Sequence, residues 1–339
     1  MIDQLILQDV ERIKRGLRRG DFRGKRVLVT GGAGFIGGWL CDVLVSFDAE
    51  VVCLDNLSTG KLENIHHLLA KSKFKFINEN VCAFEGDIKY DYILHLASRA
   101  SPEEYQQHPI ETLQANSIGS YNVLELARKH DSAILLASTS EVYGDAGVFP
   151  TPENCWGNVN SIGPRSCYDE GKRFAEALFM AYHRKYGLDV RIARIFNSYG
   201  PRLRAEGAYG RAVSRFVTQA LANQPLTVYG DGTQTRSFCY ITDTSVGLLL
   251  LLTSKGTEGE VVNVGNPEEV MILELAQRIK QLTGSTSPIT FHPLPEDDPR
   301  RRCPDISRAE KLLGWKPKIG LGQGLGRTVT WFRQKRKNE

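Results

Sequence analysis

Two side chains that could share a proton-transfer step lie in the segment CYDEGKR. Tyr168 and Lys172 are four residues apart, so that on a helix both project from one face. A tyrosine with a pKa of about 10 is a poor base at neutral pH, but a neighbouring ammonium group favours the phenolate. The pair therefore predicts proton abstraction from a hydroxyl group. By itself, however, Tyr-x-x-x-Lys is more often a solvated helix face.

A second group of polar side chains follows an apolar segment. In LLASTSEVYG, Thr139, Ser140 and Glu141 come after a run with the composition of a buried strand. Ligands of parallel α/β sheets bind at the carboxyl ends of the strands. We therefore expect Thr139 to hydrogen-bond to a substrate hydroxyl and Glu141 to place a carboxylate beside it. The alternative for Glu141 is an ordinary loop acid.

A glycine-rich stretch predicts the cofactor. VLVTGGAGFIGGWL places Gly31, Gly34 and Gly37 between a strand and a helix, which suits a tight turn, close approach of a pyrophosphate and close helix–strand packing. Asp55 ends the next apolar segment, EVVCLD, where its carboxylate can accept both ribose hydroxyls and repel a 2′-phosphate. The pattern predicts NAD rather than NADP. The alternative for Asp55 is a cap of the loop NLSTG.

The elements that must position these residues alternate along the chain. Short apolar strands are expected at about residues 25–30, 50–55, 73–81, 90–97, 132–138 and 188–196, and helices at about 34–46, 110–129 and 165–186. This alternation is typical of a parallel sheet covered on both faces. The predicted fold class is α/β, a Rossmann-type doubly wound parallel sheet with a smaller C-terminal substrate-binding lobe.

Three regions are expected. Residues 1–22 predict an amphipathic helix that packs against the body or a partner, residues 23–196 an NAD-binding domain, and residues 197–339 a nucleotide-sugar-binding lobe partly interleaved with it. In the lobe, shorter helices are expected at 211–222, 272–283 and 307–313, separated by turn-rich loops. The basic tail RQKRKNE is expected to be a frayed, solvated end.

Composition narrows the partners. The 339 residues carry a net charge of +4 in local clusters rather than in a continuous basic stripe, which favours an anionic small molecule over nucleic acid. Seven cysteines without a Cys-x-x-Cys pair predict a reducing compartment, no disulfides and no metal. No segment approaches the roughly 20 apolar residues of a membrane span. We therefore expect a cytoplasmic protein with no membrane partner.

Several longer motifs carry a resemblance to a known family. TGGAGFIG, HLAS, STSEVYGD, NVNSIGPRSCYDEGKR, ARIFNSYGPR, LTVYGDGTQTRSF, VNVGNPEE and DDPRRRCPDI together resemble the UDP-glucuronic acid decarboxylases of the extended short-chain dehydrogenase/reductase superfamily, over about residues 24–332. The resemblance implies NAD-dependent decarboxylation of UDP-glucuronic acid to UDP-xylose through a 4-keto intermediate, with NAD regenerated in each turnover. It also implies a homodimer formed through a helix bundle that includes the segment carrying Tyr168.

The resemblance also assigns roles to residues. It implies catalytic roles for Tyr168, Lys172, Thr139, Glu141 and Arg236. Beyond the glycines, Asp55 and the Tyr–Lys pair, it places at the cofactor Phe35, Ile36, Asn56, Thr59, Gly60, Asn80, Val81, Leu96, Ser98, Ser198 and Arg211. It places at the nucleotide sugar Ser140, Glu141, Asn197, Arg215, Tyr229, Arg236 and Arg302. The arginines have an independent rationale, because guanidinium groups bind the paired oxygens of a diphosphate.

Departures from the family pattern leave alternatives open. Asn80 replaces the usual aspartate near adenine, Arg99 and Ser161 replace prolines, and Tyr209 and Arg215 replace an acid and an asparagine. A UDP-glucuronate 4-epimerase would use the same groups without losing carbon dioxide. A third enzyme would release the UDP-4-keto-pentose together with NADH, and a non-catalytic sensor would bind both ligands without turnover.

Overall fold

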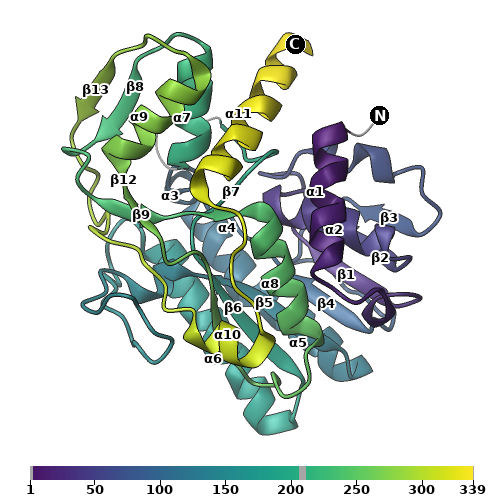
Figure 1. Cartoon of the computed structure of the whole chain (residues 1–339). Helices are drawn as coiled ribbons and strands as arrows, with labels where there is room; N and C mark the ends of the chain where they lie inside the picture. The colour runs from purple at the N-terminus through teal and green to yellow at the C-terminus, as the bar shows by residue number, and fades with distance from the viewer. Residues whose placement is uncertain (1–2, 206–210, 339) are drawn as a thin grey trace.

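The structure, a computed structural model, describes residues 3–205 and 211–338. Its centre is a seven-stranded, wholly parallel sheet in the order β11-β6-β5-β4-β1-β2-β3 (Figure 1). The strands are β1 (Arg26–Thr30), β2 (Glu50–Leu54), β3 (Phe74–Ile77), β4 (Tyr92–His95), β5 (Ala133–Thr139), β6 (Val190–Ile195) and β11 (Val261–Val264). The predicted fold class is confirmed. The chain order reverses between β1 and β4, which in such sheets opens a crevice for a ligand.

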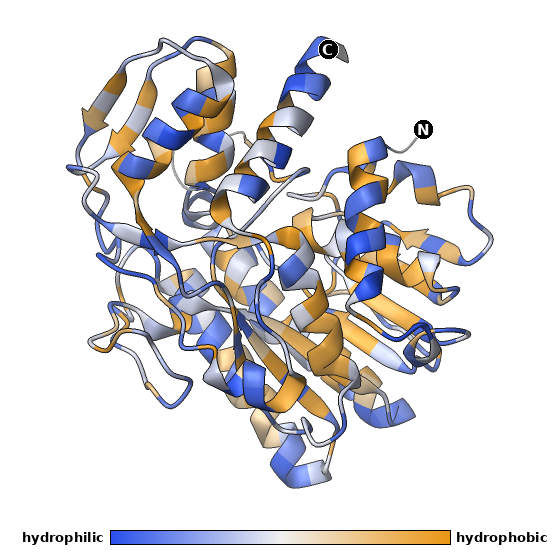
Figure 2. Cartoon of the chain, viewed as in Figure 1, coloured by the Kyte–Doolittle hydropathy of each residue, from blue (hydrophilic) through white to orange (hydrophobic). Residues whose placement is uncertain are grey.

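Helices bury both faces of the sheet. On one face lie α2 (Phe35–Ser46) and α8 (Ile241–Thr253), and on the other α5 (Ser120–His130) and α6 (Ser166–Tyr186). Successive strand residues point to opposite faces, so Val27 and Val29 belong to one core cluster and Leu28 to the other. The strands are accordingly mostly apolar, as Figure 2 shows.

The helix that precedes α5 contains a wider turn. After the short helices α3 (Pro102–Gln107) and α4 (Pro109–Gln114), residues Ala115–Gly119 form a π-helical turn that leads into α5. This turn buries Asn116, whose amide nitrogen donates to the Oγ of Ser98 at 3.0 Å and to the carbonyl of Thr112 at 2.9 Å. The predicted single helix over 110–129 is thus interrupted where it faces the end of β4. Such turns often mark functional sites.

The first helix, α1 (Gln4–Arg15), packs on α8 and α2 through Ile6, Val10 and Ile13. The side chain of Asp9 on the same face is buried and accepts a hydrogen bond from Tyr240 at 2.6 Å. The predicted amphipathic helix therefore joins the main core.

The second lobe contains α7 (Ala212–Leu221), α9 (Ile272–Thr283) and the parallel strand pair β8 (Leu226–Tyr229) and β13 (Ile289–His292). Two further pairs connect it to the sheet: β7 (Ser198–Tyr199) with β10 (Cys239–Tyr240), and β9 (Thr235–Ser237) with β12 (Glu269–Met271). Between β10 and β12 the chain returns to the central sheet, where α8 packs on one face and β11 forms an edge strand. The short helix α10 (Ser307–Leu313) packs on them.

The expectation of a frayed C-terminal tail is wrong. Residues Leu321–Asn338 form one helix, α11, which packs on α7 and α9. Leu325, Val329 and Phe332 are buried along one side of it, and this apolar stripe docks the helix. Its basic residues are also engaged: Lys335 pairs with Glu63 at 3.0 Å. The segment RQKRKNE does not predict this packing by itself, because the buried residues Leu325, Val329 and Phe332 precede it.

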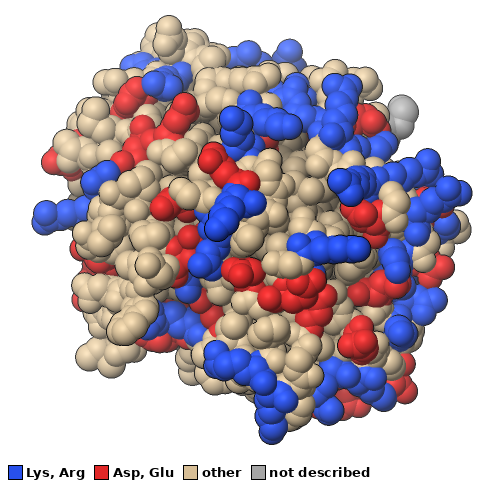
Figure 3. Space-filling view, turned by 60° about the horizontal axis from the view of Figure 1, so that its bottom comes forward, with Lys and Arg blue, Asp and Glu red and all other residues tan. Residues whose placement is uncertain are grey.

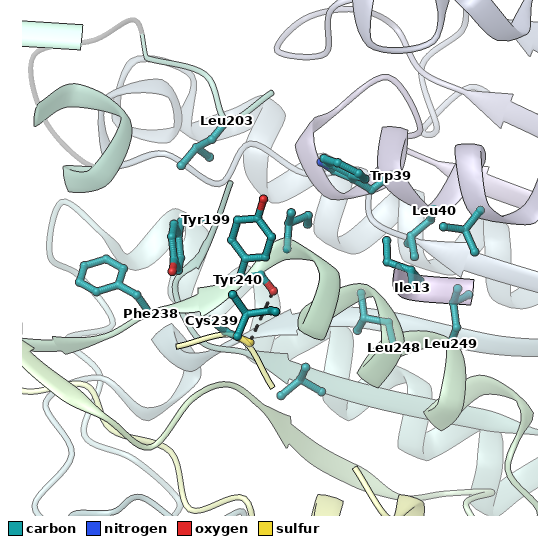
Figure 4. Close-up of a cluster of buried hydrophobic side chains, with 14 of the residues drawn as sticks. Ile13, Trp39, Leu40, Tyr199, Leu203, Phe238, Cys239, Tyr240, Leu248 and Leu249 are labelled. Atoms are coloured by element: carbon teal, nitrogen blue, oxygen red, sulfur yellow. Dashed lines mark hydrogen bonds between the residues drawn. The ribbon is translucent and has the colours of Figure 1, made fainter. Parts of the chain in front are cut away.

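A continuous core joins the two lobes. Figure 4 shows Ile13 of α1 beside Leu248 of α8, with Trp39 of α2 in the same cluster. Tyr199 and Tyr240 of the connecting pair and Phe238 next to it also belong to this cluster. Tyr199 and Tyr240 pack edge to face with ring centroids 5.5 Å apart. The second lobe is therefore fixed to the sheet by large apolar side chains.

The surface carries charges of both signs. Figure 3 shows Lys and Arg side chains interspersed with Asp and Glu on the face it presents. Within residues 3–205 and 211–338, no helix is long and apolar enough to cross a membrane. In the same part of the chain, no group of three or more His, Cys, Asp or Glu side chains is placed to hold a metal ion.

Candidate active site

One cavity of about 490 Å³ lies between the carboxyl ends of the sheet strands and the second lobe. Every site residue named from the sequence lines this cavity, with the exceptions of Gly60 and Arg302. Of the five departures, Asn80, Arg99 and Arg215 line it, Ser161 is exposed outside it, and Tyr209 lies outside the described residues. The parallel fold thus brings together residues that are up to about 200 positions apart in the chain.

The glycine loop between β1 and α2 forms one end of the cavity. Gly31 has φ +69°, and a Cβ on it would lie 2.9 Å from the backbone nitrogen of Ala97. A Cβ on Gly37 would lie 2.2 Å from the carbonyl oxygen of Gly31. Gly34 caps α2 without a side-chain hydrogen bond, and the first turn carries no acid. The unpaired amides of a helix start therefore face the cavity, as an anion such as a pyrophosphate requires.

Asp55 lies beside this loop and is largely buried. Its two carboxylate oxygens accept hydrogen bonds from the backbone nitrogens of Ala33 at 3.0 Å and Leu57 at 2.8 Å. Burial raises the pKa of the Asp55 carboxyl group. Gly60 does not reach the cavity, but a Cβ on it would lie 2.8 Å from both Asp55 oxygens. Gly60 therefore leaves room for the carboxylate that lines the wall.

Lys172 and Tyr168 project from the first half of α6. The Nζ of Lys172 donates to the carbonyl of Ala137 at 2.9 Å, and burial lowers the pKa of Lys172 to about 8. Tyr168 is hydrogen-bonded to Thr139, but burial raises the pKa of Tyr168 above its usual value. The net direction is opposite to the one expected from a neighbouring ammonium group, since the Lys172 Nζ lies 6.0 Å from the Tyr168 ring centroid and donates to a carbonyl.

An aromatic side chain that the sequence did not single out stacks on the catalytic candidate. The rings of Tyr105 and Tyr168 are parallel, with centroids 5.1 Å apart, and the Arg165 guanidinium lies 6.0 Å from the Tyr105 ring centroid. Tyr105 comes from α3, beyond the end of β4. No local motif marks it, whereas Arg165 lies within the longer motif NVNSIGPRSCYDEGKR.

Glu141 lies between two arginines, with 16% of its side chain exposed. Its carboxylate pairs with Arg302 at 3.0 Å and, through a short contact, with Arg165. Burial alone would raise the pKa of Glu141, but the two guanidinium groups hold it well below its usual range. Arg302 also donates to the carbonyl of Gly144 and is itself buried. It therefore stands behind Glu141 and does not line the cavity.

The ion pairs continue towards the second lobe. Asp298 accepts from Arg236 at 2.9 Å and lies 3.5 Å from Arg165, so the two arginines share one acid. Asp169, one turn along α6 from Arg165, has its pKa raised to about 7 by burial and by Glu141. This end of the cavity is an alternating network of opposite charges. Side chains from both lobes contribute to it.

Three further predicted residues close the cavity from the second lobe. The Arg215 guanidinium lies 5.0 Å from the ring centroid of Tyr229, which favours stacking of the cation on the aromatic face. Asn197, just after β6, donates from its amide nitrogen to the carbonyl of Ser237 at 3.1 Å. The wall opposite the sheet is thus built from β8, α7 and the connecting strands.

Residues 27–265 match the model of the family described as the NAD dependent epimerase/dehydratase family. A UDP-glucuronic acid decarboxylase of Danio rerio is 49% identical over 315 residues, covering 93% of this chain and 74% of that protein. A UDP-glucuronic acid decarboxylase of Arabidopsis thaliana is 48% identical over 301 residues, covering 88% of this chain and 86% of that protein.

Solved structures of nucleotide-sugar enzymes are also similar to the chain. The UDP-glucose 4-epimerase of Thermotoga maritima with UDP-glucose is 30% identical with a TM-score of 0.83, covering 92% of this chain and 99% of that one. The dTDP-glucose 4,6-dehydratase of Streptomyces venezuelae with NAD and TYD bound is 29% identical with a TM-score of 0.83, covering 92% and 98%. The chain therefore belongs to the NAD dependent epimerase/dehydratase family, among the relatives named UDP-glucuronic acid decarboxylase.

Proposed function

We propose that this chain converts UDP-glucuronic acid to UDP-xylose and carbon dioxide through a 4-keto intermediate. The observation that carries the proposal is one cavity with a dinucleotide-type glycine loop at one end and, at the other, Tyr168 beside the ionised carboxylate of Glu141. Relatives at about 48% identity that carry the decarboxylase name support the choice of substrate.

The residues at the glycine end fit NAD. The first turn of α2 would hold the pyrophosphate and Asp55 the adenosine ribose. When bound, NAD supplies a hydride acceptor that is restored within each turnover, and a positive charge that favours the phenolate of Tyr168. Among the other predicted cofactor residues, Asn80 accepts from the backbone nitrogen of Cys82 at 3.0 Å, so its amide is already oriented.

In the first step, Tyr168 takes the proton from the 4-hydroxyl of the sugar as C4 is oxidised. Thr139 orients the tyrosine through their hydrogen bond. Burial lowers the pKa of Lys172 to about 8, so the side chain is mostly protonated at neutral pH and places a positive charge inside the site. Asn116 holds Ser98 on the same wall.

In the second step, the carboxylate stands β to the new C4 carbonyl. The C5–C6 bond breaks, carbon dioxide leaves, and the electron pair moves into the carbonyl to form an enolate. A proton from solvent then adds at C5, and Arg236 and the ionised carboxylate of Glu141 position its donor. The return of hydride to C4 and of the Tyr168 proton to its oxygen completes UDP-xylose.

A product assay tests this function. Purified enzyme incubated with UDP-glucuronic acid should give a product lighter by one carbon dioxide, with no NADH accumulating. A product of unchanged mass and altered sugar stereochemistry would instead identify a 4-epimerase. A keto pentose formed together with stoichiometric NADH would identify the third alternative.

We also propose a division of labour and an assembly. Residues 1–22 form a bracing helix, residues 23–196 bind NAD, and residues 197–339 bind the nucleotide sugar. A homodimer is supported by apolar side chains exposed on the packed helices α4, α5 and α6, namely Ile110, Tyr121 and Phe174, each more than half exposed. Light scattering should give a dimer for the wild type and a monomer for Phe174→Glu. The seven free cysteines suit the cytoplasm.

A further inference from the structure

Two arginines in the cavity wall pair with one carboxylate that stands behind them. The Nη1 of Arg99 lies 3.1 Å from Oε2 of Glu104, and the Nη1 of Arg204 lies 2.7 Å from Oε1 of the same residue. Arg99 follows β4, Glu104 lies on α3, and Arg204 follows β7. The side chains are only 15%, 20% and 27% exposed, so the pairs are partly shielded from water.

This triad borders the reacting end of the cavity. Glu104 directly precedes Tyr105, whose ring stacks on Tyr168 at 5.1 Å. Arg99 directly follows Ser98, and both arginines of the triad line the cavity. The other arginines of this end are paired in the same way, Arg165 with Glu141 and Arg236 with Asp298. Each of these arginines is thus paired with a carboxylate of the protein itself.

The pairing matters because a carboxylate that leaves as carbon dioxide loses its negative charge. A guanidinium group bound to that carboxylate would stabilise the ground state and lose its partner in the transition state, so binding would tighten and the reaction would slow. We propose that Glu104 is a positioning residue that keeps the guanidinium of Arg99 from binding the sugar carboxylate, and so permits decarboxylation. This inference rests on the proposed function.

The test is the isosteric variant Glu104→Gln, studied as the NAD-loaded enzyme. Releasing Arg99 should raise the affinity for UDP-glucuronic acid about tenfold and lower kcat for carbon dioxide release by a similar factor, with KM falling together with kcat. Affinity for UDP-glucose, which lacks the carboxylate, should not change. Glu104→Gln also releases Arg204, so two double variants separate the arginines. Arg99→Met/Glu104→Gln should restore the wild-type selectivity and rate, whereas Arg204→Met/Glu104→Gln should not. Glu103→Gln on the same helix is the matched control.

Two results would overturn the proposal. One is a Glu104→Gln enzyme with an unchanged ratio of affinities for UDP-glucuronic acid and UDP-glucose in calorimetry. The other is a lower kcat at unchanged KM that the double variant does not restore, which is what a merely structural role predicts. Failure of the wild type to release carbon dioxide would instead overturn the proposed function, whereas the calorimetric ratio would still decide the role of Glu104.

Discussion

The two ends of the cavity are built in different ways. At the glycine end, backbone groups of one strand–turn–helix unit face the cavity, and Asp55 is oriented by backbone nitrogens. At the sugar end, side chains from α3, α6 and both lobes hold one another through ion pairs, with Glu141 and Asp298 at the centre. Local chain geometry therefore defines the first end, and mutual pairing of distant charges defines the second.

This difference predicts how each end fails. A change at the glycine end should weaken one ligand contact and leave the rest of the fold intact. A change in the buried charge network should leave another charge without its partner, which costs stability as well as activity.

The largest effect is expected for Tyr168→Phe, which removes the proposed proton acceptor. The value of kcat for carbon dioxide release should fall by about a thousandfold, within the range contributed by general acid–base groups. NAD binding, followed by fluorescence, should persist because the glycine end is untouched. Residual activity within tenfold of the wild type would mean that another group takes the proton.

Arg302→Met tests the charge network. If Arg302 acts by holding Glu141, its removal leaves a buried carboxylate with one partner and should lower the free energy of unfolding by about 3 kcal/mol. The pKa of Glu141 should rise, and kcat should fall. Arg301→Met is the matched control, because Arg301 is exposed and its pair with Glu269 should contribute at most about 1 kcal/mol. A raised KM with an unchanged free energy of unfolding would instead mean that Arg302 binds the substrate, as the resemblance implied.

Asp55→Asn tests the glycine end. Loss of a charged acceptor for the ribose hydroxyls should weaken NAD binding about thirtyfold, measured by calorimetry, and should reduce discrimination against NADP. Asn80→Asp at the neighbouring position should change the NAD affinity less than about threefold, because it keeps the acceptor for Cys82. Equal effects of the two variants would contradict the assignment of Asp55.

The smallest effect is a pH dependence. Burial lowers the pKa of Lys172 to about 8, so the ammonium form is present below that pH and is lost above it. The rate at pH 9 should be about a tenth of the rate at pH 7 if the ammonium form is required. Lys172→Arg stays protonated and should keep its own lower rate constant across this range. A wild-type rate that is flat to pH 10 would rule out a required ammonium.

Much of the fold was predictable because its signals are local. The apolar strands, α2, α6 and the glycine loop each carry their pattern within about a dozen residues, since period and composition reflect burial on one or both faces. The sequence did not predict that α8 and β11 belong to the central sheet and its helices, although the α8 segment ITDTSVGLLLLLT is strongly apolar. The reason is that strands and helices alternate less regularly after residue 197, which favoured a separate lobe.

The sequence by itself determined the cofactor end, because a tight turn with φ +69° at Gly31 and an acid after the next strand are properties of adjacent residues. It also named Tyr168 and Lys172, through the longer motif NVNSIGPRSCYDEGKR and not through their spacing alone. Only the tertiary structure decided that Arg302 stands behind Glu141, that Gly60 makes room for Asp55, and that Tyr105 covers Tyr168. These contacts join residues that are far apart in the sequence and meet only in the folded interior, where the low dielectric strengthens their interactions. No local sequence pattern predicts such contacts.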